Sequence, residues 1–251
     1  SRRPRRTAAP RWASSEERIY EQLHLLKQNG LNGILISVNP FYLEHIPFEK
    51  TERVVRAAGE LFGHNMMIYQ QTYFTKFSDM GQKGTMSLEN FLETESEIEF
   101  GKNVEFFLNG RAPYAMEKYG IFPQYSAKYF FDRACVPQFI RGWHNHFDNY
   151  GNYIPGYCGG LSFGDYRCLD ELLEEGIDSD DYPVLAFIAG DNFERLLLFA
   201  ESFGYTEREQ GYLSKCHLCL DIRLYLVRQH PFEELRPKEF YDRLYDYERD
   251  Y

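Results

Sequence analysis

The front of the chain alternates between helical and strand-like hydrophobic patterns. Apolar residues spaced three or four apart predict a helix that begins at a Ser14/Glu17 capping box. The continuous apolar run over 33–38 then predicts a strand buried on both faces, as in parallel sheets. A second helix over 49–62 and a second apolar strand over 66–70 repeat the order. This succession predicts a βαβ unit and therefore a parallel sheet.

The middle and rear of the chain follow a different pattern. Short helices are predicted over 87–100, 112–119 and 126–135. From 143 to 154, alternating residues flank the turn Asn149-Tyr150-Gly151-Asn152, which predicts a β-hairpin. After the hairpin the apolar spacing is helical throughout. The helices predicted there cover 169–175, 183–189, 193–203, 216–228 and 237–247.

Two parallel strands are too few for a sheet that is complete in itself. Residues 104–108 form a candidate third strand, and no strand pattern precedes the first one. We therefore expect the front of the chain to be the back part of a barrel or of a doubly wound sheet whose opening strands are missing. Residues 1–13, with five arginines and two prolines, are expected to be a disordered or artefactual basic arm.

Composition and charge exclude several classes of protein. A chain of 251 residues with 43% hydrophobic residues can bury a sizeable core, and its apolar runs are far too short to cross a membrane. The net charge of −10 argues against nucleic acid as a partner. Five cysteines without a secretory signal fit thiols or metal ligands in a reducing compartment. We therefore expect a cytoplasmic protein with neither membrane nor nucleic acid as partner.

The candidate chemistry lies in the cysteines. Cys216 and Cys219 stand three positions apart at the start of a predicted helix, where both sulfurs can face one ion or cluster and the helix N–H groups favour thiolates. Cys158 precedes two glycines, which allow the backbone to bend closely around a bulky inorganic group. With Cys135 the thiols number four, as tetrahedral zinc or a [4Fe–4S] cluster requires. Cys168 is left over and is interpreted as a small buried residue.

Other polar residues carry weaker signals. His144 and His146 would point to the same side of a strand, as metal ligands or a general base do, but a histidine satisfied by a backbone carbonyl gives the same pattern. His217 lies between the paired cysteines and would face away from their sulfurs. Asp221 and Arg223 are interpreted as ion-pairing residues on the helix surface.

Two polar residues follow the first predicted parallel strand. Ser37 and Asn39 stand at its carboxyl end, where ligands of parallel sheets bind, and they could hold the hydroxyl groups of a nucleoside or sugar. Serine and asparagine also suit the start of a loop for local reasons, so both interpretations stay open. The sequence contains no Gly-rich phosphate loop, nucleophile elbow or His-Glu-x-x-His motif.

Three segments together resemble the back part of radical SAM proteins with a SPASM- or twitch-like C-terminal extension. They are residues 33–41, residues 146–158 and residues 214–223. In the middle segment a turn containing Asp and Gly leads to a cysteine, which is similar to the hairpin of those proteins. The resemblance implies an α/β fold. In this fold, residues 14–136 would form the C-terminal part of a partial (β/α) TIM-like barrel. Residues 137–251 would form a small, mostly helical cluster-binding extension with a β-hairpin.

The resemblance also implies chemistry. Such proteins bind S-adenosylmethionine and a [4Fe–4S] cluster, which together cleave the sulfonium to a radical that abstracts a substrate hydrogen. By position, Ser37 and Asn39 would match residues that contact S-adenosylmethionine. The ligands of an auxiliary cluster would be Cys135, Cys158, Cys216 and Cys219.

This sequence departs from the family at its defining motif. The Cys-x-x-x-Cys-x-x-Cys that holds the SAM-cleaving cluster is absent, because all five cysteines lie at or after position 135. We therefore expect a truncated radical SAM enzyme that is inactive alone. Its substrate is unknown, and a peptide or protein is one candidate.

Two other functions fit the same cysteines. One is a zinc-binding structural or interaction module without catalysis. The other is a thiol redox protein that uses the Cys216–Cys219 pair, although no thioredoxin-like strand precedes that pair.

Overall fold

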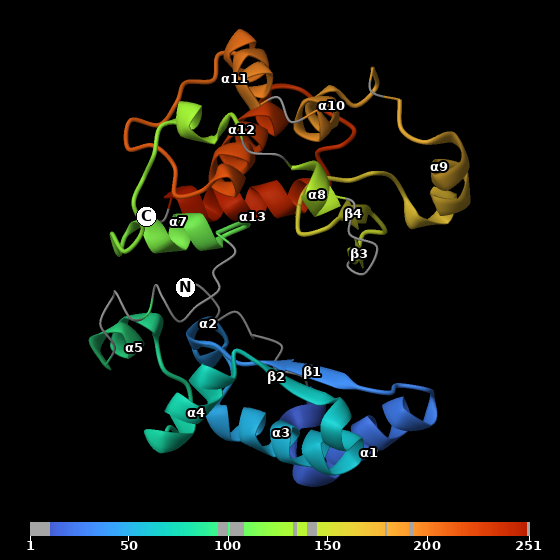
Figure 1. Ribbon diagram of the computed structural model, residues 1–251, viewed down its shortest axis with the longest axis vertical. Coiled ribbons are helices and arrows are strands. Elements are labelled where there is room, and N and C mark those ends of the chain that lie inside the picture. Colours follow the sequence, from blue (N-terminus) through green and yellow to red (C-terminus); the bar gives the residue numbers. More distant parts are fainter. Residues whose placement is uncertain are drawn as a thin grey trace, which may run out of the picture. The chain divides into compact units, whose positions relative to one another are not determined.

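The computed structural model describes residues 11–94, 100, 108–132, 135–139, 145–178, 180–190 and 193–249. The chain divides into two compact units, residues 1–105 and residues 106–251, each with its own hydrophobic core (Figure 1). The sequence placed this boundary at 136/137. In the structure the short helices between 112 and 139 therefore belong to the rear unit.

The front unit has the helix–strand–helix–strand order that the hydrophobic pattern predicts. Ser15, and not Ser14, caps the first helix by accepting a hydrogen bond from the Arg18 N–H at 3.3 Å. The second helix ends at Gly63, whose φ is +55°. The elements are η1 (Arg11–Ser14), α1 (Glu16–Gln28), β1 (Ile34–Ser37), α2 (Pro40–Leu43), α3 (Phe48–Phe62), η2 (Gly63–Asn65), β2 (Met66–Tyr69), α4 (Gln71–Asp79) and α5 (Leu88–Thr94).

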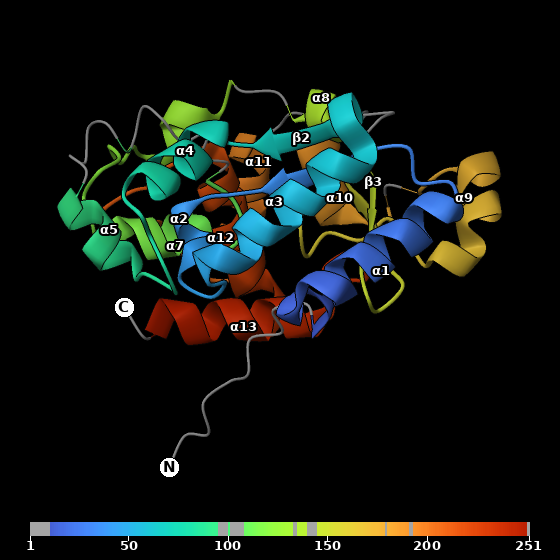
Figure 2. The same cartoon turned by 90° about the horizontal axis from the view of Figure 1, so that it is seen from below.

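The two front strands are parallel, as predicted, but only one face of the pair is covered. Ile34 and Ile36 pack on the core that α1 and α3 form. Figure 1 shows both helices on one side of the strands, and Figure 2 shows them from that side. On the other face Leu35 is 51% exposed and Met67, its partner in the register, is 54% exposed. The prediction that the first strand is buried on both faces is therefore wrong.

The rear unit is mostly helical and contains the predicted hairpin. Strands β3 and β4 are antiparallel, with His146 opposite Ile154. The elements are α7 (Ala112–Glu117), η3 (Ala127–Phe130), α8 (Val136–Phe139), β3 (Asn145–Phe147), β4 (Tyr153–Pro155), η4 (Tyr166–Cys168), α9 (Leu169–Glu175), α10 (Pro183–Ala189), α11 (Phe193–Ser202), α12 (Lys215–Gln229) and α13 (Lys238–Arg249).

Helix α12 forms the centre of the rear unit. Every residue from His217 to Leu224 is buried, and α11, α13 and η3 lie against the helix. Most helices bury one stripe, so a helix buried on all sides must find partners for each polar side chain it carries. Asp221 and Arg223 are 7% and 5% exposed, so the prediction that they lie on the helix surface is wrong.

Several predictions from the sequence are not tested by the described residues. The candidate strand over 104–108 lies outside the described residues except for its last position, and the predicted helix over 87–100 is described only as α5 and Phe100. The described strands form one parallel pair and one hairpin, so the barrel stays a prediction. No helix of the described chain has the length and apolar character needed to cross a membrane.

A buried carboxyl group holds the start of α10. Glu234 is fully buried and accepts a hydrogen bond from the Val184 N–H at 2.8 Å. Burial raises the pKa of this carboxyl group above its ordinary value, although the N–H groups of Val184 and Leu185 act in the opposite direction. The folded protein therefore keeps a proton at pH values where the unfolded chain has already lost it.

The stability of the protein is expected to depend on pH through Glu234. As pH rises above the unfolded pKa of about 4.5, the folded state binds more protons than the unfolded state, so the free energy of unfolding falls. Glu234→Gln cannot ionise and is expected to remove this part of the fall. Calorimetric Tm values across that pH range measure it, with the exposed Glu239→Gln as control. If the Tm of wild type and of Glu234→Gln changed with pH in the same way, the prediction would be wrong.

Candidate metal centre

The structure brings together the four cysteines that the sequence singled out. Cys135, Cys158, Cys216 and Cys219 line one pocket of the rear unit. They come from three separate places: the residue before α8, the turn after β4, and the first turns of α12. The pocket has a volume of about 40 Å³, far below the roughly 300 Å³ at which pockets for organic ligands begin.

Helical periodicity places the α12 side chains in the pocket. Cys216, Cys219, Leu220 and Arg223 recur at the spacing that lines one face of a helix, and all four border the pocket. The helix start is fixed by Ser214, whose hydroxyl oxygen accepts a hydrogen bond from the His217 N–H at 3.0 Å. The same hydroxyl donates to the carbonyl of Leu108 at 2.7 Å.

Burial raises the pKa of two thiols of this pocket. It raises the pKa of Cys158 to about 12, and the other three cysteines add to the rise while Arg223 opposes it. The pKa of Cys216 rises to about 11 for the same reason, although the residue as a whole is exposed. A metal bound here must therefore displace protons from the sulfurs.

Two cationic side chains border the same pocket. Arg223 donates from Nη1 to the carbonyl of Gly159 at 3.0 Å and to the Tyr241 hydroxyl at 3.2 Å. No carboxylate within the described ranges pairs with it, and its Nε is buried without a hydrogen bond. The Nζ of Lys215 is buried in the same way and lies 4.3 Å from the centre of the Phe193 ring.

The neighbouring face of α12 carries a polar network that excludes the cysteines. Tyr205 donates to Asp221 Oδ2 at 2.7 Å, and its oxygen lies 2.6 Å from the Tyr212 hydroxyl. His217 Nδ1 accepts from the Leu213 N–H at 3.2 Å, and its Nε2 lies 2.7 Å from Arg208 Nη1. Burial, followed by the charge of Arg208, lowers the pKa of His217 to about 3.

These contacts fix the role of His217. Its ring is neutral at physiological pH and is fully buried. Both ring nitrogens face the network, while Cys216 and Cys219 face the pocket, so the prediction that His217 faces away from their sulfurs is confirmed. The network also determines the rotation of α12, and through it the direction in which the two thiols point.

The glycines after Cys158 serve a purpose that the sequence did not indicate. A Cβ atom added to Gly160 would overlap the ring of Phe240 and come within 2.9 Å of Tyr241, and one added to Gly159 would lie 3.0 Å from Phe240. Both glycines therefore allow α13 to pack closely, since Phe240 and Tyr241 belong to that helix.

Other predicted site residues lie outside this pocket. His146 is exposed on β3, and His144 lies outside the described residues. Cys168 is exposed at the end of η4, so its interpretation as a buried residue is wrong. The sequence analysis missed Lys215, Tyr241 and the inward direction of Arg223. The seven-residue spacing from Cys216 to Arg223 was a usable signal, because it places both on one helix face.

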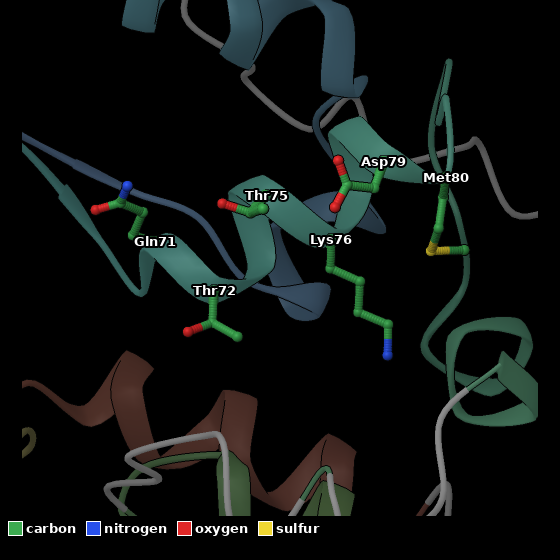
Figure 3. A pocket seen from close by; sticks show the side chains of 6 residues that line it. All are labelled: Gln71, Thr72, Thr75, Lys76, Asp79 and Met80. Atoms are coloured by element: carbon green, nitrogen blue, oxygen red, sulfur yellow. The ribbon is translucent and has the colours of Figure 1, made fainter.

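The front unit positions Ser37 and Asn39 at the end of β1. Asn39 caps α2 by accepting a hydrogen bond from the Tyr42 N–H at 3.0 Å, which is the local role open to an asparagine at a loop start. A separate pocket lies along α4, which follows β2. Figure 3 shows its side chains on that helix and, for Met80, on the residue directly after it. It is lined by Gln71, Thr72, Thr75, Lys76, Asp79 and Met80, and neither Ser37 nor Asn39 belongs to it.

A single metal ion and an iron–sulfur cluster need different spacings between the ligand sulfurs. Among the residues that the structure describes, no three Cys, His, Asp or Glu side chains form a group that could hold one metal ion. Tetrahedral zinc needs every sulfur at about 2.3 Å from the same ion. In a [4Fe–4S] cluster each thiolate binds a different iron, so the sulfurs stand farther apart. Four cysteines are a donor set that both kinds of site can use.

No family model matches this chain, and neither a curated protein nor a solved structure matches it.

The polar network is expected to stabilise α12 strongly. Asp221→Ala leaves the Tyr205 hydroxyl without its acceptor and removes a carboxylate 3.6 Å from Arg208, so the free energy of unfolding should fall by about 3 kcal/mol. Urea unfolding measures the loss. The exposed Glu209→Ala is the control and should change stability by no more than about 0.5 kcal/mol. Equal stability of both variants would contradict this account.

Gly160 is expected to tolerate no side chain. Gly160→Ala meets Phe240 and Tyr241 and also adopts a φ of +78°, so the costs of overpacking and of positive φ add to about 2–5 kcal/mol. Gly120 has a φ of +63° with open space around it, so Gly120→Ala should show only the smaller backbone cost. Thermal unfolding compares the two variants. If Gly160→Ala were as stable as Gly120→Ala, α13 would have to move away from the new side chain without loss of stability, and the prediction would be wrong.

Proposed function

We propose that the rear unit binds a [4Fe–4S] cluster through Cys135, Cys158, Cys216 and Cys219. The single observation that carries the proposal is that four thiols from three separate segments line one small pocket. Their number equals the cysteine ligands of a fully ligated [4Fe–4S] cluster. Chance burial of single cysteines gives no reason for all four to meet.

The charges around the pocket support the proposal. Four thiolates on a [4Fe–4S]²⁺ core carry a net charge of about −2. Such a charge inside a protein needs compensation, and the buried cations Arg223 and Lys215 border the pocket. The pocket volume of about 40 Å³ is too small for an organic substrate or for S-adenosylmethionine.

The wider activity rests on the resemblance to radical SAM proteins. In this proposal the pocket holds an auxiliary cluster of an S-adenosylmethionine-dependent radical enzyme. With four cysteine ligands no iron stays open to a substrate, which favours electron transfer over direct substrate binding. Ser37 and Asn39 are the candidate contacts of S-adenosylmethionine, and the substrate is unassigned, with a peptide or protein as a candidate.

Anaerobic reconstitution with iron and sulfide tests the cluster. Wild-type protein is expected to turn brown and to hold about four irons per chain. The Cys216→Ser/Cys219→Ser double variant should lose most of the iron and the visible absorbance. Cys168→Ser is the matched control, because Cys168 is exposed and does not line the pocket, and it should keep both.

Three results would overturn the proposal. Colourless wild-type protein after reconstitution would show that the four thiols hold no cluster. Protein purified with one zinc and no iron would favour the structural zinc module. Iron loss in Cys168→Ser equal to that of the double variant would show that iron binds the thiols without selectivity.

A further inference from the structure

Arg223 is the most unusual charged group of the rear unit. It is 5% exposed, it lies one turn after Cys219 on α12, and its guanidinium group borders the four-cysteine pocket. Its position is fixed by the carbonyl of Gly159 at 3.0 Å and by the Tyr241 hydroxyl at 3.2 Å. Tyr241 donates in turn to the carbonyl of Gly160, so the turn after Cys158 and helix α13 hold the same arginine.

The contacts of Arg223 leave its charge uncompensated. The carbonyl and the hydroxyl are dipoles, and within the described part of the chain no carboxylate approaches the guanidinium group. A buried cation without a counter-charge costs several kcal/mol. Cys158 and Cys219 line the same pocket as Arg223. Thiolates bound to a metal are therefore the negative charges that this position can use.

Lys215 borders the same pocket but is placed differently. Its Nζ lies over the Phe193 ring, which already provides a favourable contact for the cation. Within the described chain Arg223 has no cation–π contact of this kind, and only the Gly159 carbonyl and the Tyr241 hydroxyl hold its guanidinium group. Of the two cations, Arg223 is therefore the one whose charge has only dipoles as partners.

We propose that Arg223 is the buried counter-charge of the four-cysteine site and raises the reduction potential of the group bound there. The inference rests on the proposed function. One-electron reduction adds a negative charge to the site without forming or breaking a bond. A fixed positive charge in a buried site stabilises the reduced form more than the oxidised form, because reduction makes the site more negative.

The test compares reduction of reconstituted wild-type protein with that of Arg223→Met, which removes the charge and keeps most of the length. Dithionite supplies the electrons in a mediated redox titration followed by visible absorbance and EPR. At a fixed potential, the ratio of reduced to oxidised protein is expected to fall at least tenfold in Arg223→Met, which equals about 59 mV for one electron. Iron content and circular dichroism establish that both proteins are folded and loaded.

Matched variants separate charge from packing. Arg228 lies on the same helix but stacks on Tyr245, with 3.8 Å between Cζ and the ring centre, outside the pocket, so Arg228→Met should leave the ratio unchanged. Arg223→Lys keeps the charge and should stay within about threefold of wild type. If Arg223→Met fails to fold or to hold iron, Arg223→Lys decides, because a folded Lys variant without iron would show that charge is not what matters.

The outcomes distinguish this inference from the proposed function. Wild-type protein that takes up no iron overturns the proposed function, and the role of Arg223 with it. Fully loaded Arg223→Met with the potential of wild type overturns the inference alone. A fall of the same size in the ratio of reduced to oxidised protein in Arg228→Met also overturns the inference, since the effect would then not depend on the position of the charge.

Discussion

The rear unit depends on one constraint, which is the burial of α12 on every side. A helix satisfies its own backbone hydrogen bonds but not its polar side chains, and each buried polar group without a partner costs free energy. His217, Asp221 and Arg223 lie within the buried stretch of this helix. Tyrosines, a second arginine and the carbonyls after Cys158 provide partners for them. The arrangement of α7, α13 and the loops around α12 follows from that requirement.

The period of the helix separates two kinds of chemistry along α12. Residues spaced by three, four and seven positions place the paired cysteines and Arg223 at the pocket. Residues 217 and 221 lie on the adjacent face, in a network that is closed to the pocket. One face therefore presents cysteines and an arginine to the pocket, while the other satisfies its polar side chains within the network. This division explains how a helix with so many buried polar residues can be stable.

The front unit follows simpler rules. Its strands bury one face against α1 and α3 and leave the other exposed, and its asparagine at the end of β1 caps a helix. Aromatic rings at the start of α3 and in α4 and α5 form a second layer of packing, with Phe48, Phe77 and Phe91 in edge contacts of 5.5–5.6 Å. Nothing in these contacts requires a cofactor. The link of this unit to S-adenosylmethionine therefore rests on resemblance.

The sequence by itself determined the local elements and the choice of cysteines. Helices α9 and α10, the hairpin and the end of α3 lie where turns, caps and periodicity predicted them, because these signals act over a few neighbouring residues. Only the tertiary structure decided that Arg223 points into the pocket, that Cys168 is exposed and that one face of β1 is open. Burial depends on which distant segments lie against a residue, and local spacing carries no information about those segments.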